Sequence, residues 1–181
     1  AERAPGDVAL VFSPWGRLVA RGGAWATTGD RVHPVIGADP LRDVLAPNNF
    51  IATGSQIVRG AWLERLHGFV ETHRLLEDVD LLMRIVMAGG RLVEAASDEQ
   101  LFWYRRHPTS ASRRNRLAFA HAEVRNGKAA EAHWRAISGG ALTSGRAEFL
   151  ADLYFDAARV LAEEHDPAFD ALTAHILRLA P

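Results

Sequence analysis

Two short polar segments of this chain combine residue types that could move a proton and hold a phosphate. The first, Glu77–Arg84 (EDVDLLMR), places two adjacent carboxylates at the start of an apolar helical pattern. The second, Tyr104–Ser112 (YRRHPTSAS), places cationic residues and a histidine after an aromatic strand. A carboxylate can act as a general base toward a hydroxyl, and guanidinium groups bind phosphate oxygens through a planar fork. Together the two segments suit transfer of a group from a phosphorylated donor to a hydroxyl.

Each segment also has a purely structural interpretation. Acidic residues in a first helical turn are stabilised by the helix dipole, and Asp80 can pair with Arg84 one turn later. Solvated arginines are ordinary where a strand ends. Arg105 and His107 nevertheless point the same way along an extended chain, so that one ligand can meet both. A neutral imidazole can also complete a divalent metal site.

The composition is that of a soluble globular protein. The 181 residues are 48% apolar and 24% charged, enough for one domain with a helical appendage. The net charge of −1 gives no overall attraction to nucleic acid or to an anionic membrane. The absence of cysteine excludes disulfides and thiolate metal sites, and it fits a reducing cytoplasm. No apolar run approaches the roughly 18 residues of a membrane span.

An α/β part is predicted to position these segments, up to residue 112. Apolar and β-branched runs predict strands over 8–13, 17–20, 91–95 and 100–105, and an interrupted strand over 49–58. Capping residues and periodicity predict helices over 39–45, 61–66 and 78–88. Residues 14–16 have turn chemistry, and residues 22–38, rich in Gly and Thr, are interpreted as a loop.

Beyond residue 112 the composition shifts to Ala, Glu, Arg and His with a 3.6-residue period, which predicts an all-helical module over 113–181. Helices are expected near 114–125, 128–138, 146–165 and 167–179. Asn126-Gly127 is interpreted as the turn of a helical hairpin, of which one copy does not make a repeat array. We therefore expect a mixed α/β protein with two parts, 1–112 and 113–181.

In their order, the segments of the first part resemble the second half of the family 2 glycosyltransferases, which have the GT-A fold. Family members run through an apolar strand, a Gly-containing hairpin, an Asn-containing loop into a strand, a short helix, a Gly-Phe-acid segment, a Glu-Asp-x-Asp-Leu helix and a Tyr-Arg-x-His strand exit. The matching segments here are Val8–Ser13 with Gly16, Asn48–Ile51, Ser55–Arg59, Gly68–Glu71, Glu77–Leu81 and Tyr104–His107. No single motif is specific, but the six in this order are.

The resemblance implies a partial GT-A-like sheet with flanking helices, and an inverting, metal-dependent transfer of a sugar. By resemblance Asp78 is the catalytic base, which takes the proton of the acceptor hydroxyl as that hydroxyl attacks the anomeric carbon. Glu77 orients the acceptor or supports the base. Val79 stands where the family commonly has Trp, and His67 and Val70 stand where it often has Gly and Asp. These departures alter the shape of the acceptor side more than they alter the base.

The resemblance also assigns substrate contacts. Arg105 and His107 would face the donor's diphosphate and its Mg²⁺ or Mn²⁺, with His107 as a metal ligand. Ser55 and Arg59 fall where acceptor contacts are expected. The implied partners are a nucleotide-sugar donor and a saccharide or lipid-linked acceptor, and no nucleic acid. We expect a cytoplasmic enzyme, which a lipid-linked acceptor would bring to a membrane surface.

Family members begin with a β-α-β nucleotide-binding half and an Asp-x-Asp metal motif, both upstream of the strand that is Val8–Ser13 here. We expect that half to lie in a longer polypeptide or in a partner chain. This chain alone should then bind a nucleotide sugar poorly and should not catalyse the transfer of its sugar. Strand edges bared by the missing half favour pairing between copies, so we expect a homodimer that need not be physiological.

Two other hypotheses belong to different classes of function. In one, the chain is a degenerate transferase remnant without catalytic activity, whose helices over 113–181 bind a protein partner. In the other, Asp78, Asp80 and His107 form a hydrolytic metal site. A stable complex that is indifferent to Asp78→Asn would favour the first, and tight metal binding without nucleotide would favour the second.

Overall fold

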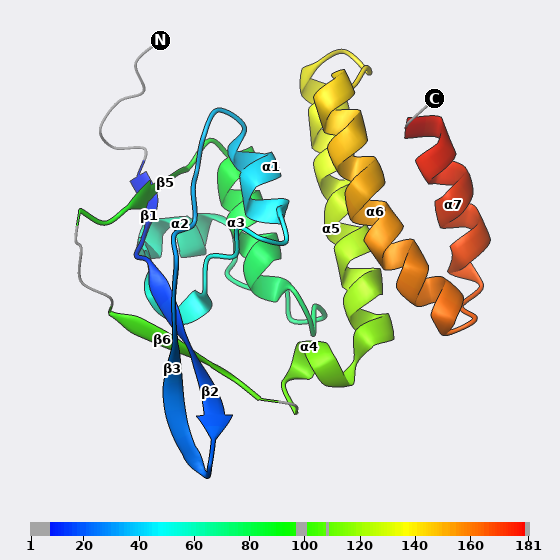
Figure 1. The fold of residues 1–181 in the computed structure, drawn as a ribbon. Coiled ribbons are helices and arrows are strands. Elements are labelled where there is room, and N and C mark those ends of the chain that lie inside the picture. Colours follow the sequence, from blue (N-terminus) through cyan, green and yellow to red (C-terminus); the bar gives the residue numbers. More distant parts are fainter. Residues whose placement is uncertain (1–7, 97–100, 108, 180–181) are drawn as a thin grey trace. The chain divides into compact units, whose positions relative to one another are not determined.

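The computed structural model describes residues 8–96, 101–107 and 109–179, and Figure 1 shows how their helices and strands are arranged. It is a mixed α/β protein with two compact units. One unit comprises the described residues up to Glu71 together with Asp78–Ser110, and the other comprises Thr72–Glu77 with the described residues from Ala111 onwards. The short segment Thr72–Glu77 joins the helical unit, which the sequence did not predict.

The first sheet of the first unit has the order β4-β1-β5. Its middle strand, β1 (Val8–Phe12), pairs in parallel with β5 (Arg91–Glu94) and antiparallel with β4 (Gln56–Val58). Two side chains of β1, Leu10 and Phe12, are fully buried. A continuously apolar strand in the middle of a sheet is expected to be covered in this way.

The second sheet has the order β3-β2-β6. Here β2 (Trp15–Arg21) pairs in parallel with β6 (Phe102–Arg106) and antiparallel with β3 (Ala24–Val32). Only Ser13 and Pro14 separate β1 from β2, so one stretch of chain supplies the middle strand of both sheets. The predicted turn over 14–16 is therefore wrong, because the chain continues into the second sheet instead of returning along the first.

The predicted loop over 22–38 is also wrong for most of its length, because it contains β3. Arg21 pairs with Ala24 across Gly22-Gly23, and both glycines have positive φ, as the tight turn of a β-hairpin requires. Most of β3 is exposed, so it lacks the alternation of a strand with one buried face. Its pairing comes from the hairpin turn rather than from a hydrophobic pattern.

The helices of the first unit follow the prediction closely. They are α1 (Pro40–Leu45), α2 (Gly60–Arg65) and α3 (Glu77–Met87). The Asp39 side chain caps α1 by accepting a hydrogen bond from the backbone N–H of Arg42. Helix α3 buries Leu81, Leu82 and Ile85, and thereby brings its first turn to a fixed place beside the sheets.

The second unit contains α4 (Ala111–Arg114), α5 (Arg116–Ile137), α6 (Ser144–Glu163) and α7 (Ala168–Leu179). Helix α5 packs on α6, and α6 packs on α7. Their core includes Trp134 of α5, Leu150 and Tyr154 of α6, and Leu172 of α7. The predicted breaks near 138–140 and 166–167 are confirmed, but the one at Asn126-Gly127 is not.

Helix α5 runs unbroken through Asn126 and Gly127, so the predicted helical hairpin is wrong. Both residues are buried, and the Asn126 side chain donates a hydrogen bond to the carbonyl of Leu76 at 3.3 Å. A Cβ atom at position 127 would lie 2.5 Å from Cε1 of Tyr154. Gly127 is therefore the residue that lets the Tyr154 ring of α6 lie against α5.

Candidate functional site

The Asp78 carboxylate is held by hydrogen bonds on both of its oxygens at the start of α3. Its Oδ2 accepts from the hydroxyl of Thr53 at 2.8 Å, and its Oδ1 accepts from the backbone N–H of Val79 at 2.8 Å. The first N–H groups of a helix have no intrahelical partner, so an acidic side chain is favourable there. The carboxylate is half-buried. The carboxylate is thus oriented and partly open to water, where a carboxylate can take a proton from a hydroxyl within hydrogen-bond reach.

The short 3₁₀ turn η2 (Thr53–Ser55) presents Thr53 to Asp78. The interrupted strand predicted over 49–58 is in fact this turn followed by β4. Ser55 was predicted as an acceptor contact, but only 7% of it is exposed, and its hydroxyl donates to the carbonyl of Ala52 at 2.8 Å. The Phe102 ring of β6 lies where a side chain at position 54 would be. Ser55 and Phe102 therefore fix the turn that carries Thr53.

An aromatic cluster holds the segment that leads into this turn. The rings of Trp15, Phe50 and Tyr104 lie with centroids 5.7–6.1 Å apart, mostly edge to face. The indole N–H of Trp15 also donates to the carbonyl of Phe50 at 2.9 Å. The middle strand of the second sheet is thereby connected to the segment before η2.

Asp80, the second acidic residue of the helix, belongs to the scaffold. Its carboxylate accepts from Arg84 at 2.8 Å, as the spacing of one helical turn predicts. The same guanidinium donates to the carbonyls of Leu66 at 2.9 Å and Gly68 at 2.8 Å. Arg84 therefore ties α3 to the end of α2.

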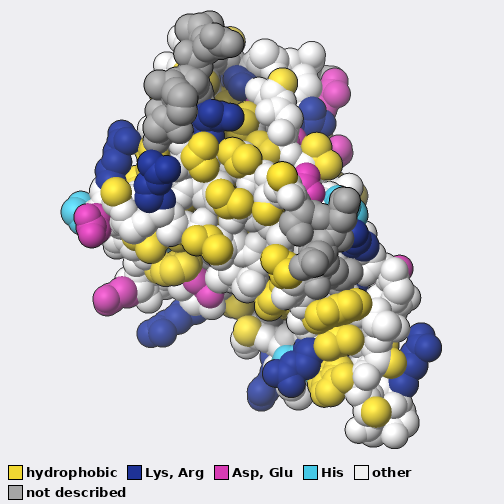
Figure 2. Space-filling view, turned by 90° about the vertical axis from the view of Figure 1, so that its left-hand side faces the viewer, with side chains coloured by type: hydrophobic (Ala, Val, Ile, Leu, Met, Phe, Trp, Pro, Cys, Tyr) yellow, Lys and Arg dark blue, Asp and Glu magenta, His cyan; other side chains and the backbone are white. Residues whose placement is uncertain are grey.

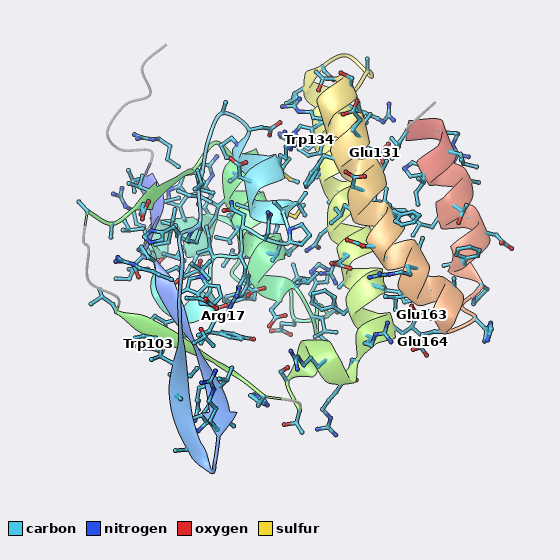
Figure 3. All side chains as sticks on the ribbon, in the orientation of Figure 1. Arg17, Trp103, Glu131, Trp134, Glu163 and Glu164 are labelled. Carbon is cyan, nitrogen blue, oxygen red and sulfur yellow. The ribbon has the colours of Figure 1, made fainter. Side chains whose placement is uncertain are left out.

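Arg105 lies on an outer face of the second sheet. The β2 residues that pair with Trp103, Arg105 and Trp25 are Gly16, Leu18 and Ala20. Because alternate residues of a strand share a face, these three side chains lie on the same side of the sheet. All three are exposed, and the Arg105 guanidinium lies 5.6 Å from the centroid of the Trp25 ring. Figure 3 labels Trp103 on this strand.

The other predicted site residues are His107 after β6, Arg59 before α2 and Glu77 at the start of α3. His107, just beyond β6, is exposed, and its Nδ1 lies 3.0 Å from the Thr109 hydroxyl. Arg59 is exposed at the N-terminal cap of α2. Glu77 is the first residue of α3 and is half-buried. Hydrogen bonds and ion pairs between described residues do not join Asp78 to Arg105 or to His107.

Metal binding was expected at His107 in the complete enzyme. Within residues 8–96, 101–107 and 109–179, no three His, Asp or Glu residues form a group that could hold a metal ion.

A buried ionic cluster lies within the second unit, around Glu131 of α5 (Figure 3). Only 7% of Glu131 is exposed, and its carboxylate accepts from His175 at 2.7 Å, from Arg135 at 2.8 Å and from the Tyr154 hydroxyl at 3.3 Å. Burial alone would raise the pKa of Glu131, but the hydrogen bonds and charges of His175 and Arg135 outweigh it and lower the pKa below 4.5. Burial, with the Glu131 charge, raises the pKa of Tyr154.

Two features of the first unit were missed from the sequence. Thr53 lies 25 positions before Asp78, and no spacing rule connects the two. Trp25 and Trp103 become one surface only through strand pairing, although the Gly22-Gly23 turn signals the hairpin. Hydrophobic side chains are also exposed on the face of the molecule that Figure 2 shows. One exposed hydrophobic residue of the first unit is Ile57 on the edge strand β4, which is 77% exposed.

Comparison of the chain with protein-family models, with curated proteins and with solved structures found no match. Among the described residues, no helix combines the length and apolar character that crossing a lipid bilayer requires.

Proposed function

We propose that the first unit is the acceptor-side half of an inverting glycosyltransferase, with Asp78 as its general base. The observation that carries the proposal is the Asp78 carboxylate, oriented by Thr53 and by the first turn of α3. In the proposed reaction Asp78 takes the proton of the acceptor hydroxyl, whose oxygen forms a bond to the anomeric carbon. The bond from that carbon to the donor phosphate breaks, and the nucleoside diphosphate leaves.

The order of elements along the chain supports this proposal. The hairpin of β2 and β3 follows the apolar strand β1, and the Asn-containing segment leads through η2 into β4. Helix α2, the Gly68–Glu71 segment, α3 and β6 follow in turn. This is the sequence of elements that the resemblance to family 2 glycosyltransferases implies, and here Asp78 begins the helix that carries the Glu-Asp pair.

In this proposal Arg105 and His107 contact the donor diphosphate, which leaves from the carbon that the acceptor oxygen attacks. Arg105 is exposed and lies over Trp25, so its guanidinium can donate hydrogen bonds to phosphate oxygens without giving up a buried contact. Arg59 and Glu77 remain proposed acceptor contacts, whereas Ser55 acts through the turn that holds Thr53.

The proposal is tested on the gene product that contains this chain, incubated with a panel of uridine-, guanosine- and thymidine-diphosphate sugars, Mg²⁺ or Mn²⁺, and saccharide acceptors. The readout is nucleoside diphosphate released in the presence of acceptor. Asp78→Asn should lower kcat by about a hundredfold to ten-thousandfold, because a general base contributes a factor of that size. Thr53→Val should lower kcat less, since it removes one contact that orients the base.

Glu64→Gln is the matched control, because Glu64 is an exposed carboxylate on α2 of the same unit. It should leave kcat unchanged. Full activity of the Asp78→Asn variant would contradict the proposal, as would the absence of diphosphate release with every donor. A protein complex through residues 113–181 that is unchanged by Asp78→Asn would favour a non-catalytic interaction module instead.

A further inference from the structure

The second unit contains a pocket lined by α5, α6 and α7, with a volume of about 290 Å³. Its lining from α5 lies on one helix face, at His121, Val124 and Lys128, which are spaced by three and four residues. Leu161 of α6 and Leu172 of α7 are buried and form part of an apolar floor. This volume equals about ten molecules of liquid water at ~30 Å³ each, so the pocket suits a small ligand.

The two ends of the pocket differ in charge. At one end His121 pairs with Asp166, in the connection between α6 and α7, at 3.0 Å. Away from that connection, the pocket is lined by Lys128 and Arg178. In the described part of the chain neither of these two cations has a carboxylate partner, and no acidic residue lines the pocket.

His175 separates the pocket from the buried ionic cluster behind it. Its Nε2 lies 2.7 Å from Glu131, and its Nδ1 lies 3.4 Å from Nη2 of Arg178. A carboxylate only accepts and a guanidinium only donates, so in the neutral imidazole these partners place the hydrogen on Nε2. Glu131 is already satisfied by His175, Arg135 and Tyr154. Its negative charge is therefore committed within the cluster and does not neutralise Arg178 or Lys128.

We propose that this pocket binds an amphiphile with one anionic head group and an apolar tail of about eight carbons, because its volume holds about ten water-sized groups. The head lies between Lys128 and Arg178, which donate charge-assisted hydrogen bonds to carboxylate or phosphate oxygens. The tail covers Val124, Leu161 and Leu172. This site involves only the second unit, so it does not depend on Asp78 or on the proposed transfer reaction.

The experiment titrates the full chain, labelled with ¹³C at Leu and Val methyl groups, with octanoate and with octyl phosphate. Saturable shifts of the Val124, Leu161 and Leu172 methyl signals are expected with both anions, and octanol should bind at least tenfold more weakly. The double variant Lys128→Ala/Arg178→Ala should weaken anion binding by about a hundredfold, on the order of tenfold for each charged hydrogen-bond donor. Added salt should weaken binding as well.

Two further variants distinguish a specific site from general attraction. Ala171→Phe fills the pocket from an exposed position on α7 and should abolish binding without disturbing the core. Arg159→Ala removes an exposed cation of α6 that lies outside the pocket, and should leave binding unchanged. A tenfold preference for one of the two anions shows whether the site favours a carboxylate or a phosphate head group.

Several results would overturn the proposal. They are octanol binding as tightly as octanoate, unchanged anion binding in the Ala171→Phe variant, and no saturable shift of the pocket methyl groups with either anion. The Asp78→Asn variant should bind both anions as the wild type does, whatever its transferase activity. Each of the two proposals can therefore be refuted without affecting the other.

Discussion

Replacing Glu123 by Gln should remove a pH dependence from the stability of the helical unit. Glu123 is a half-buried residue of α5, and Asp156 of α6 adds a second negative charge near it. Burial, with a smaller contribution from Asp156, raises the pKa of Glu123 from 4.5 to about 7. The folded protein therefore keeps this carboxyl protonated at a pH where the unfolded chain has already lost the proton.

The sign follows from the order of the two pKa values. The stabilisation is fully present below pH 4.5, falls as the pH rises towards 7, and is absent above pH 7. A rise from 4.5 to about 7 corresponds to about 3 kcal/mol at 1.36 kcal/mol per pKa unit. Since the side chain keeps partial contact with water, we take about 2 kcal/mol as the expected change.

Urea unfolding of the full chain between pH 4 and 8 measures this change. Glu123→Gln should match the wild type near pH 4 and exceed its free energy of unfolding by about 2 kcal/mol near pH 8. Glu148→Gln, at an exposed carboxylate of α6, is the control and should keep the wild-type profile. If Glu123→Gln is less stable than the wild type at pH 8, or shows the same pH dependence, the burial argument is refuted.

Two further predictions concern stability. Gly127→Ala should lower the free energy of unfolding by about 1–3 kcal/mol, because its Cβ would overlap the buried Tyr154 ring. The control Gly145→Ala, in the open first turn of α6, should raise the free energy of unfolding by up to about 1 kcal/mol. If Gly127→Ala also stabilises the protein, the close packing of Gly127 against Tyr154 is contradicted. Arg84→Met should lower the free energy of unfolding by about 2–4 kcal/mol, because it leaves Asp80 without this guanidinium. In the same urea titrations the control Arg65→Met, at an exposed position on α2, should lower it by less than about 0.5 kcal/mol.

Local signals were sufficient for the elements that have caps and buried periodicity. Asp39-Pro40 predicts the start of α1, and the apolar spacing of Leu81, Leu82 and Ile85 predicts α3 and its buried face. The strand β3 was missed because it is mostly exposed and has no hydrophobic alternation. The Gly22-Gly23 pair indicates a hairpin turn before β3, but it does not indicate that the residues after the turn form a strand.

The candidate site was predictable in its residues but not in its contacts. The Glu-Asp pair indicates a carboxylate at a helix start, and Asp78 is found there. That Thr53 orients it depends on a turn held by Phe102, whose position is set by the pairing of β6 with β2. Arg105 lies on the same face as Trp25 and Trp103 because β2 pairs with both β3 and β6. Contacts between strands far apart in the chain have no local sequence signal.

The sequence by itself determined where most helices begin and end, since capping residues, proline and apolar spacing act within a few positions of one another. It also determined that a carboxylate stands at the first turn of α3. Only the tertiary structure decided that Asn126-Gly127 continues a helix. There, a hydrogen bond to Leu76 and the fit of the Tyr154 ring against Gly127 outweigh the local preference of these two residues for a turn.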